Sequence, residues 1–250
     1  MARRRRRNRR SRRGRFAFLY RLLTFLVICG AIVAALALFF KVETIEVTGA
    51  ERYSQQEIVD ACGIQTGSNL FLMDKYDAAG RITSRLNYVE QVQITRRLPS
   101  TLCIHVTECK ATVAIEHDGT FFLISGSGKI VDTASEASGC GIVTGVTIFQ
   151  PQVGAVIDAP EENRPARDQL LELLKALRDR EMLADVQEIH LEDPSAVTMG
   201  YLDRFTVTLP WGADMEYKMN YLMAVVERLE DNERGIINMM QDQKVNFIPR

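Results

Sequence analysis

The sequence has few of the residues that usually mark a catalytic or metal centre. Its 250 residues include three histidines, five cysteines and one tryptophan. No two histidines have the i, i+4 spacing of a zinc-binding helix, and neither H-E-x-x-H nor the nucleophile elbow G-x-S-x-G occurs. The sequence therefore offers no catalytic residue, cofactor-binding residue or metal ligand, and we expect a protein that is not an enzyme.

The cysteines show no zinc-binding pattern such as paired C-x-x-C motifs. Cys103 and Cys109 are close in sequence, but on an extended strand they would lie roughly 20 Å apart, too far for a disulfide. We expect buried free thiols, and a disulfide among the other cysteines beyond residue 40 stays open.

A phosphate-binding loop is also missing. The stretch S-G-S-G-K at 125–129 would need glycine at 123 and Ser or Thr at 130, but Leu123 and Ile130 stand there. A hairpin turn explains these glycines better.

The charge is divided unevenly along the chain. Residues 1–21 contain eleven of the thirty-one basic residues and no acid. Residues 41–250 contain the other twenty basic residues and all thirty-two acids, a net charge of −12. This acidic part is a poor candidate for nucleic-acid binding.

Between these parts, residues 22–40 form a run of nineteen residues without a charge. Such a run is long enough for a helix that crosses a bilayer core of about 30 Å. The adjacent arginines predict that residues 1–21 are cytoplasmic and that residues 41–250 lie outside the membrane.

The N-terminal region has three other possible interpretations. A cleaved signal would end in a site such as Ala35-Leu36-Ala37, but the apolar run continues to Phe40 and is longer than a signal core. The arginines could bind nucleic acid, although topology and anionic lipid explain them better beside a membrane helix. A buried core helix is the third option, but the run is apolar on all sides.

No proline- or glycine-rich spacer follows the apolar run. Alternation predicts a strand over 42–47, and Ser54 with Glu57 forms a capping box for a short helix that ends near Gly63. Asp74 is positioned to cap a second helix, to about residue 87. Two strands joined by a turn at 97–100 follow, which completes a β-α-α-β-β unit.

This unit resembles a POTRA domain of the FtsQ/DivIB family of bacterial cell-division proteins. The matching stretches are FKVETIEVTGAERYSQQEIVDACGIQTGSNLF and RLNYVEQVQITRRLPSTLCIHVTECKATVAI. Within them, G-x-N-L-F and R-x-x-P-x-x-L-x-I-x-V-x-E follow the family's pattern in order, next to an N-terminal anchor. We therefore expect a POTRA domain at 41–109.

Residues 110–250 read mostly as strands, with an apolar helical stripe beginning near Pro165 and another at 215–229. Small polar residues at 134–141 predict a loop. The resemblance implies a β domain here, with a sheet that extends from the POTRA hairpin and helices packed on it. The expected fold class is α+β: one transmembrane helix, a β-α-α-β-β domain and a mixed β domain.

The resemblance also implies a partner-binding site near the C-terminus. Strands are predicted at 235–240 and 244–248, and the first is free of charge, as an unprotected edge strand would be. The alternatives are that 244–248 cover this strand or that it is an inner strand. Family members often carry Asp where Asn238 stands, which weakens any charge-dependent role there. The implied partner-binding residues are Ile236, Ile237, Asn238, Met239 and Met240.

The expected function is a non-enzymatic scaffold at the division septum. Its implied partners are small bitopic division proteins of the FtsL/FtsB or DivIC type and, indirectly, the septal peptidoglycan synthase. Neither nucleic acid nor a small-molecule substrate is expected. Alternatives are a membrane-anchored cell-wall enzyme, a secreted binding module, and a POTRA-bearing secretion or assembly factor, for which the chain is too short.

Overall fold

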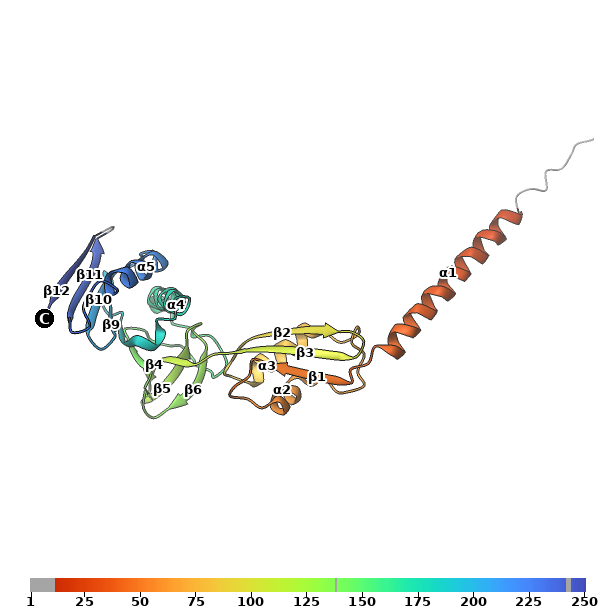
Figure 1. Cartoon of the computed structure of the whole chain (residues 1–250), viewed down its shortest axis with the longest axis horizontal. Helices are drawn as coiled ribbons and strands as arrows, with labels where there is room; N and C mark the ends of the chain where they lie inside the picture. The colour runs from red at the N-terminus through yellow and green to blue at the C-terminus, as the bar shows by residue number, and fades with distance from the viewer. Residues whose placement is uncertain (1–11, 138, 242–243) are drawn as a thin grey trace, which may run out of the picture.

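A computed structural model describes residues 12–137, 139–241 and 244–250. Most of the predicted cytoplasmic segment, residues 1–21, lies outside the described residues. Helix α1, Arg12–Phe39, is followed by two domains, each with its own sheet (Figure 1). Within α1, Phe18–Leu36 has a mean hydropathy of 2.2 and no part of it is buried, so the helix is long and apolar enough to cross a membrane.

The end of α1 is tied directly to the first domain. The Asn69 side-chain amide donates to the carbonyl of Leu36 at 3.0 Å, and Leu70 N donates to the carbonyl of Phe40 at 2.9 Å. The Leu36 carbonyl also accepts from Phe40 N at 3.4 Å, so Asn69 adds a second bond at the helix end, where carbonyls have few intrahelical partners. Phe40 and Phe71 pack edge to face with ring centroids 5.1 Å apart. The asparagine of the G-x-N-L-F motif therefore caps the membrane helix.

The three-stranded domain has the predicted order of elements. These are β1 Thr44–Thr48, α2 Gln55–Cys62, α3 Lys75–Arg85, β2 Val89–Arg97 and β3 Thr101–Glu108. The sheet order is β1-β3-β2, with β1 parallel and β2 antiparallel to β3. Alternate residues of β3, namely Leu102, Ile104 and Val106, are buried against the two helices, while His105 faces solvent.

Local signals set the helix ends in this domain. Ser54 and Glu57 form both bonds of the capping box, and Gly63 ends α2 at φ 68°, a left-handed conformation that suits glycine. Asp74 accepts hydrogen bonds from the first turn of α3. The predicted caps are confirmed.

The nine-stranded domain has the sheet order β12-β11-β10-β9-β8-β7-β4-β5-β6. Its strands are β4 Ala111–His117, β5 Thr120–Ser125, β6 Ile130–Ala134, β7 Gly141–Thr144, β8 Val186–His190, β9 Ala196–Tyr201, β10 Phe205–Pro210, β11 Gly235–Gln241 and β12 Lys244–Pro249. Leu202 and Asp203 turn β9 into β10 with φ of 57° and 55°, the mirror-type turn that favours a tight hairpin.

The predicted loop at 134–141 lies between the end of β6 and the start of β7. The sequence did not predict β7 itself, which pairs in parallel with both β4 and β8. One expectation for this sheet was wrong. The sheet does not extend from the first domain, because β3 ends at Glu108 and β4 begins a separate sheet at Ala111.

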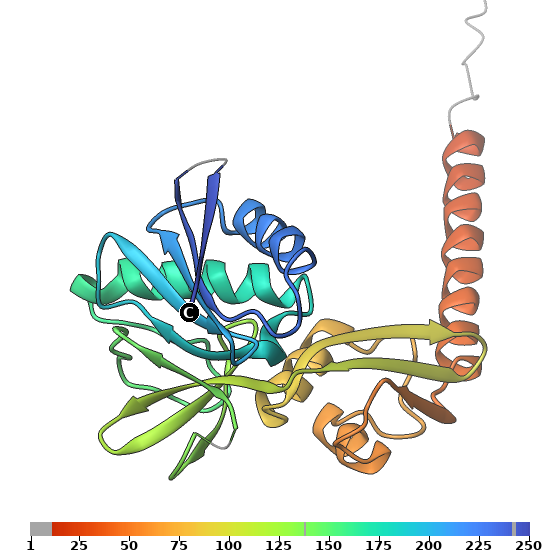
Figure 2. The same ribbon diagram turned by 60° about the vertical axis from the view of Figure 1, so that its left-hand side comes forward.

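Helices α4, Arg164–Arg178, and α5, Met215–Val226, lie on the same side of the large sheet (Figures 1 and 2). Short 3-10 turns at Glu161–Asn163 and Leu183–Asp185 flank α4. The helices bury the alternating apolar residues of the strands beneath them, including Val197, Met199, Val207, Leu209, Ile237 and Met239. Met215 and Met219 of α5 are buried as well, so the predicted apolar stripe at 215–229 packs mainly on the core, although Met223 is 37% exposed.

Polar contacts connect the two domains. Lys129, which is only 9% exposed, precedes β6 and donates from Nζ to the carbonyls of Val89 at 2.9 Å and Thr83 at 3.2 Å. The Tyr88 hydroxyl donates to Asp132 at 3.0 Å. Burial lowers the pKa of Lys129.

Candidate protein-binding edge of the C-terminal sheet

The strand predicted to be an exposed edge is an inner strand. β11 pairs in parallel with β10 on one side and antiparallel with β12 on the other. The last residues of the chain therefore cover β11, one of the two alternatives left open by the sequence. Strand addition at β11 is excluded because its backbone groups already have neighbours on both sides.

At this end of the sheet the edge strand is β12, which pairs with β11 alone, and β6 is the edge strand at the opposite end. Arg250 N donates to the carbonyl of Arg234 at 2.9 Å, so the backbone groups of Arg250 face β11. Backbone groups alternate in direction along an antiparallel strand, so those of Ile248 and Asn246 also face β11. Those of Val245, Phe247 and Pro249 then face outward. Proline has no N–H, so the edge offers the N–H groups of Val245 and Phe247.

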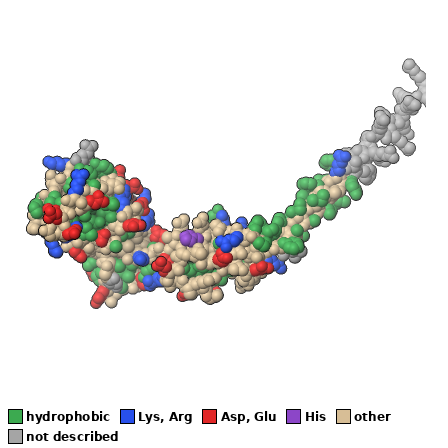
Figure 3. All heavy atoms as spheres, in the orientation of Figure 1, with side chains coloured by type: hydrophobic (Ala, Val, Ile, Leu, Met, Phe, Trp, Pro, Cys, Tyr) green, Lys and Arg blue, Asp and Glu red, His purple; other side chains and the backbone are tan. Residues whose placement is uncertain are grey.

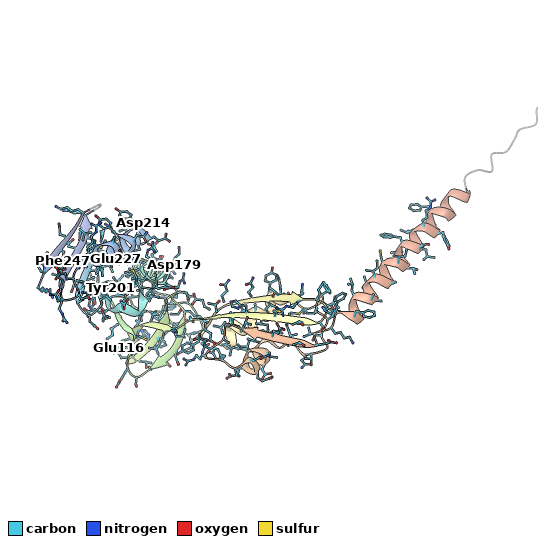
Figure 4. The ribbon with its side chains drawn as sticks, in the orientation of Figure 1. Glu116, Asp179, Tyr201, Asp214, Glu227 and Phe247 are labelled. Carbon is cyan, nitrogen blue, oxygen red and sulfur yellow. The ribbon has the colours of Figure 1, made fainter. Side chains whose placement is uncertain are left out.

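The side chains of β12 keep this edge in place. Phe247 packs edge to face on Phe205, with ring centroids 6.1 Å apart, and Val245 also contacts the core. Ile248 lies on the other side of the strand and is 51% exposed. Figure 4 shows Phe247 at the outer end of the domain, away from Glu116 on β4. The edge is therefore ordered by packing and open along its backbone.

The five predicted partner-binding residues divide between the two faces of β11. Ile237 and Met239 are fully or almost fully buried beneath the helices. Ile236 and Asn238 are half-buried on the opposite face, and Met240 is 36% exposed. The structure thus brings three of the five to an accessible face and places two in the core.

A buried lysine shapes the end of β11. Lys218 on α5 is 3% exposed, and its Nζ donates to the carbonyls of Met239 at 2.9 Å and Gln241 at 3.3 Å. The β11–β12 register shifts between Asn238 and Gln241, so these bonds hold the strand where its ladder is irregular. Periodicity marked this helix in the sequence, but it gave no sign that the lysine would point inward.

The described residues contain no group of three His, Cys, Asp or Glu side chains that could hold a metal ion. The three histidines lie apart: His105 Nδ1 is 3.1 Å from Thr48 Oγ1, His190 Nδ1 is 2.8 Å from Thr144 Oγ1, and His117 is beside Asp118.

A hollow of about 830 Å³ lies where the two domains meet and is lined by Cys109 and Cys140 among others. Burial raises the pKa of both thiols, which makes them poor nucleophiles. The arrangement therefore favours binding through the sheet edge over chemistry in a pocket.

Comparison with known proteins agrees with this architecture. The family model "POTRA domain, FtsQ-type" matches residues 40–108, and "Cell division protein FtsQ/DivIB, C-terminal" matches residues 113–241. DivIB of Clostridium botulinum is 32% identical over 127 residues, which cover 50% of this chain and 49% of the relative. FtsQ of Corynebacterium glutamicum is 34% identical over 140 residues, covering 53% and 63%.

DivIB of Bacillus subtilis is 24% identical over 204 residues, which cover 80% of this chain and 71% of the relative. The chain spans about half the length of the clostridial relative that it matches at 32% identity. The solved extracytoplasmic domain of DivIB from Geobacillus stearothermophilus is 16% identical, with a TM-score of 0.32, over 50% of this chain and 98% of that one. Because the C-terminal family model alone covers more than half of the residues, the chain belongs to the FtsQ/DivIB family of cell-division proteins.

Proposed function

We propose that this chain is a non-enzymatic scaffold of the divisome that binds small bitopic proteins of the FtsL/FtsB or DivIC type. Through them it helps to control the septal peptidoglycan synthase. It takes no small-molecule substrate and no nucleic acid. Residues 1–21 are cytoplasmic, 22–40 cross the membrane, and 41–109 and 110–250 form the POTRA and β domains outside. A fluorescent fusion to the full chain should concentrate at the septum, and an even distribution in dividing cells would contradict this role.

The open backbone edge of β12 is the observation that supports partner binding. A strand added beside it would accept from the N–H groups of Val245 and Phe247 and donate to the outward carbonyls. The same strand would lie next to Ile248, and past it Ile236, Asn238 and Met240 present the outer face of the sheet. Ile237 and Met239 would support the site from the core.

Val245→Pro tests this mode directly, because it removes an outward N–H and retains an apolar side chain. The fold should tolerate it, since proline is accepted on an edge strand where the N–H faces solvent. Loss of one intermolecular hydrogen bond costs about 1 kcal/mol, so affinity for the FtsB- or DivIC-type partner should fall roughly 5-fold. Affinity would be measured with full-length chains in detergent.

Val245→Ala is the matched control, because it trims the side chain and retains the N–H. It should bind nearly as well as the unchanged protein. If Val245→Pro unfolds at the same temperature as Val245→Ala and binds equally well, pairing at β12 is wrong.

A further inference from the structure

Apolar side chains are exposed at the end of the three-stranded domain that adjoins α1. Leu72 is 81% exposed, Tyr76 78%, Leu98 55% and Phe71 44%, and Pro99 is exposed as well. We call these five residues the membrane-proximal tip. They come from two places in the sequence, the 67–76 segment and the β2–β3 turn. In Figure 3, hydrophobic side chains continue from α1 onto the adjoining end of this domain.

The tip lies beside the last turns of α1. Pro99 and five residues from Ile32 to Phe40 line one hollow of about 430 Å³. At 1.5 Å per residue, Ile32 is about 10 Å before the end of the helix at Phe39. The β2–β3 turn therefore reaches back alongside α1, and Glu43 N holds it there by donating to the carbonyl of Ser100 at 2.9 Å.

This position sets the depth of the tip in a bilayer. Residues 22–40 are about 28 Å long as a helix, close to the thickness of the hydrocarbon core. When they fill the core, residues 32–39 lie in its outer half. A turn beside these residues lies at the level of the outer leaflet, where exposed leucine and phenylalanine side chains are stable and where tyrosine is enriched.

Basic side chains around the tip fit the headgroup level. Lys75 Nζ lies 4.9 Å from the centre of the Tyr76 ring, and Arg96 donates to the carbonyl of Met73 at 3.1 Å. Lys41, in the first residues after α1, is exposed. Such side chains extend their charged ends to water and phosphate and keep their stems in apolar surroundings. Acidic Glu43 is also nearby, so the apolar contacts rather than net charge select the partner.

We propose that the membrane-proximal tip inserts into the outer leaflet of the bilayer and holds the POTRA domain against the membrane as a second contact beside α1. This inference rests on the proposed topology. The partner is the lipid itself, through its acyl chains and glycerol region, without selection of one headgroup. The tip thereby fixes the tilt of the domain relative to the membrane plane.

The single tryptophan makes a fluorescence test practical. Trp211→Phe removes the native signal, and Leu98→Trp or Leu72→Trp then places a probe at an exposed position that tolerates substitution. The full chain is reconstituted in phosphatidylcholine vesicles with acyl chains brominated near the headgroup, which quench tryptophan on contact. Two control positions in the same background are Val33→Trp in α1 and Thr107→Trp at the other end of β3.

The probes at 98 and 72 should lose most of their fluorescence, as Val33→Trp does, and Thr107→Trp should lose none. If Val33→Trp is quenched and the probes at 98 and 72 behave like Thr107→Trp, the tip is in water and the inference is wrong, while the membrane anchor stands. That result would leave the tip available to a partner's membrane helix. If Val33→Trp is not quenched either, the topology and the inference both fail.

Discussion

The two domains differ in the number of charged residues on an edge strand of their sheets. One edge of the three-stranded sheet is β2, which carries Glu90, Arg96 and Arg97 and so resists pairing with another strand. The nine-stranded sheet ends in β12, where Lys244 is the charged residue and Phe247 and Ile248 follow. The first domain thus has a charged edge next to α1, and the second leaves an edge open at the far end of the molecule (Figure 1).

The largest expected effect comes from the core of the nine-stranded domain. Leu174 on α4 is fully buried, so Leu174→Ala should lower the free energy of unfolding by about 2–5 kcal/mol. Because the three-stranded domain has a separate core, this loss should be confined to residues 110–250. Hydrogen exchange of the full chain in detergent, followed by domain, measures both.

Leu171 on the same helix is half-buried and provides the matched control. Leu171→Ala should cost less than about 2 kcal/mol. If Leu174→Ala accelerates exchange equally in both domains, they unfold as one unit, and the contrast between them does not extend to stability.

A smaller effect is expected at the junction. Lys129→Met leaves the carbonyls of Thr83 and Val89 without this donor, at a cost of about 1–3 kcal/mol. The distribution of distances between spin labels placed on the two domains should broaden, because the substitution removes the buried hydrogen bonds from Lys129 that join the domains. Lys110→Met is the control, since Lys110 is exposed between β3 and β4. Identical distance distributions for the two variants would show that Lys129 does not set the angle between the domains.

The smallest effect concerns acid. Three carboxyls of the nine-stranded domain have a lowered pKa: Asp158 mainly through the Ala159 N–H, Glu192 through the Thr144 hydroxyl, and Asp193 through the Ser195 hydroxyl. In the three-stranded domain, the Ser54 hydroxyl likewise lowers the pKa of Glu57.

A carboxyl whose pKa is lower in the folded state binds fewer protons than in the unfolded state. Its stabilisation is complete above the unfolded pKa and is lost as the pH falls through the folded pKa. Below about pH 4.5 both domains should therefore lose stability, and the nine-stranded domain should lose more. Thermal unfolding of each domain is followed by hydrogen exchange at pH 7 and at pH 3.5. An equal loss of stability in both domains would contradict the expectation that the nine-stranded domain loses more.

Features that depend on residues close together in the sequence were predicted correctly, and features that depend on distant residues were not. The capping box at Ser54 and the helix start at Asp74 depend on neighbours three residues away, and both were predicted. β7 has four residues, and its two partners are distant in the chain, so no local pattern marks it. Strand order is equally non-local: β12 was recognised as a strand, but the sequence could not decide between an exposed β11 and a β11 covered by β12. The inward position of Lys218 depends on the same pairing.

Under the proposed topology and partner binding, the bond from Asn69 to the end of α1 has a consequence for how the molecule meets a partner. A flexible tether would let the outer domains tumble through a hemisphere. A capped helix with no spacer couples them to the rotation of α1 about the bilayer normal. The β12 edge then stays at a constant distance from the membrane surface. Two chains whose binding surfaces lie at the same distance need only diffuse together in the membrane and rotate to the right angle about the bilayer normal. Inserting residues at this joint would change the geometry of encounter without altering either binding surface.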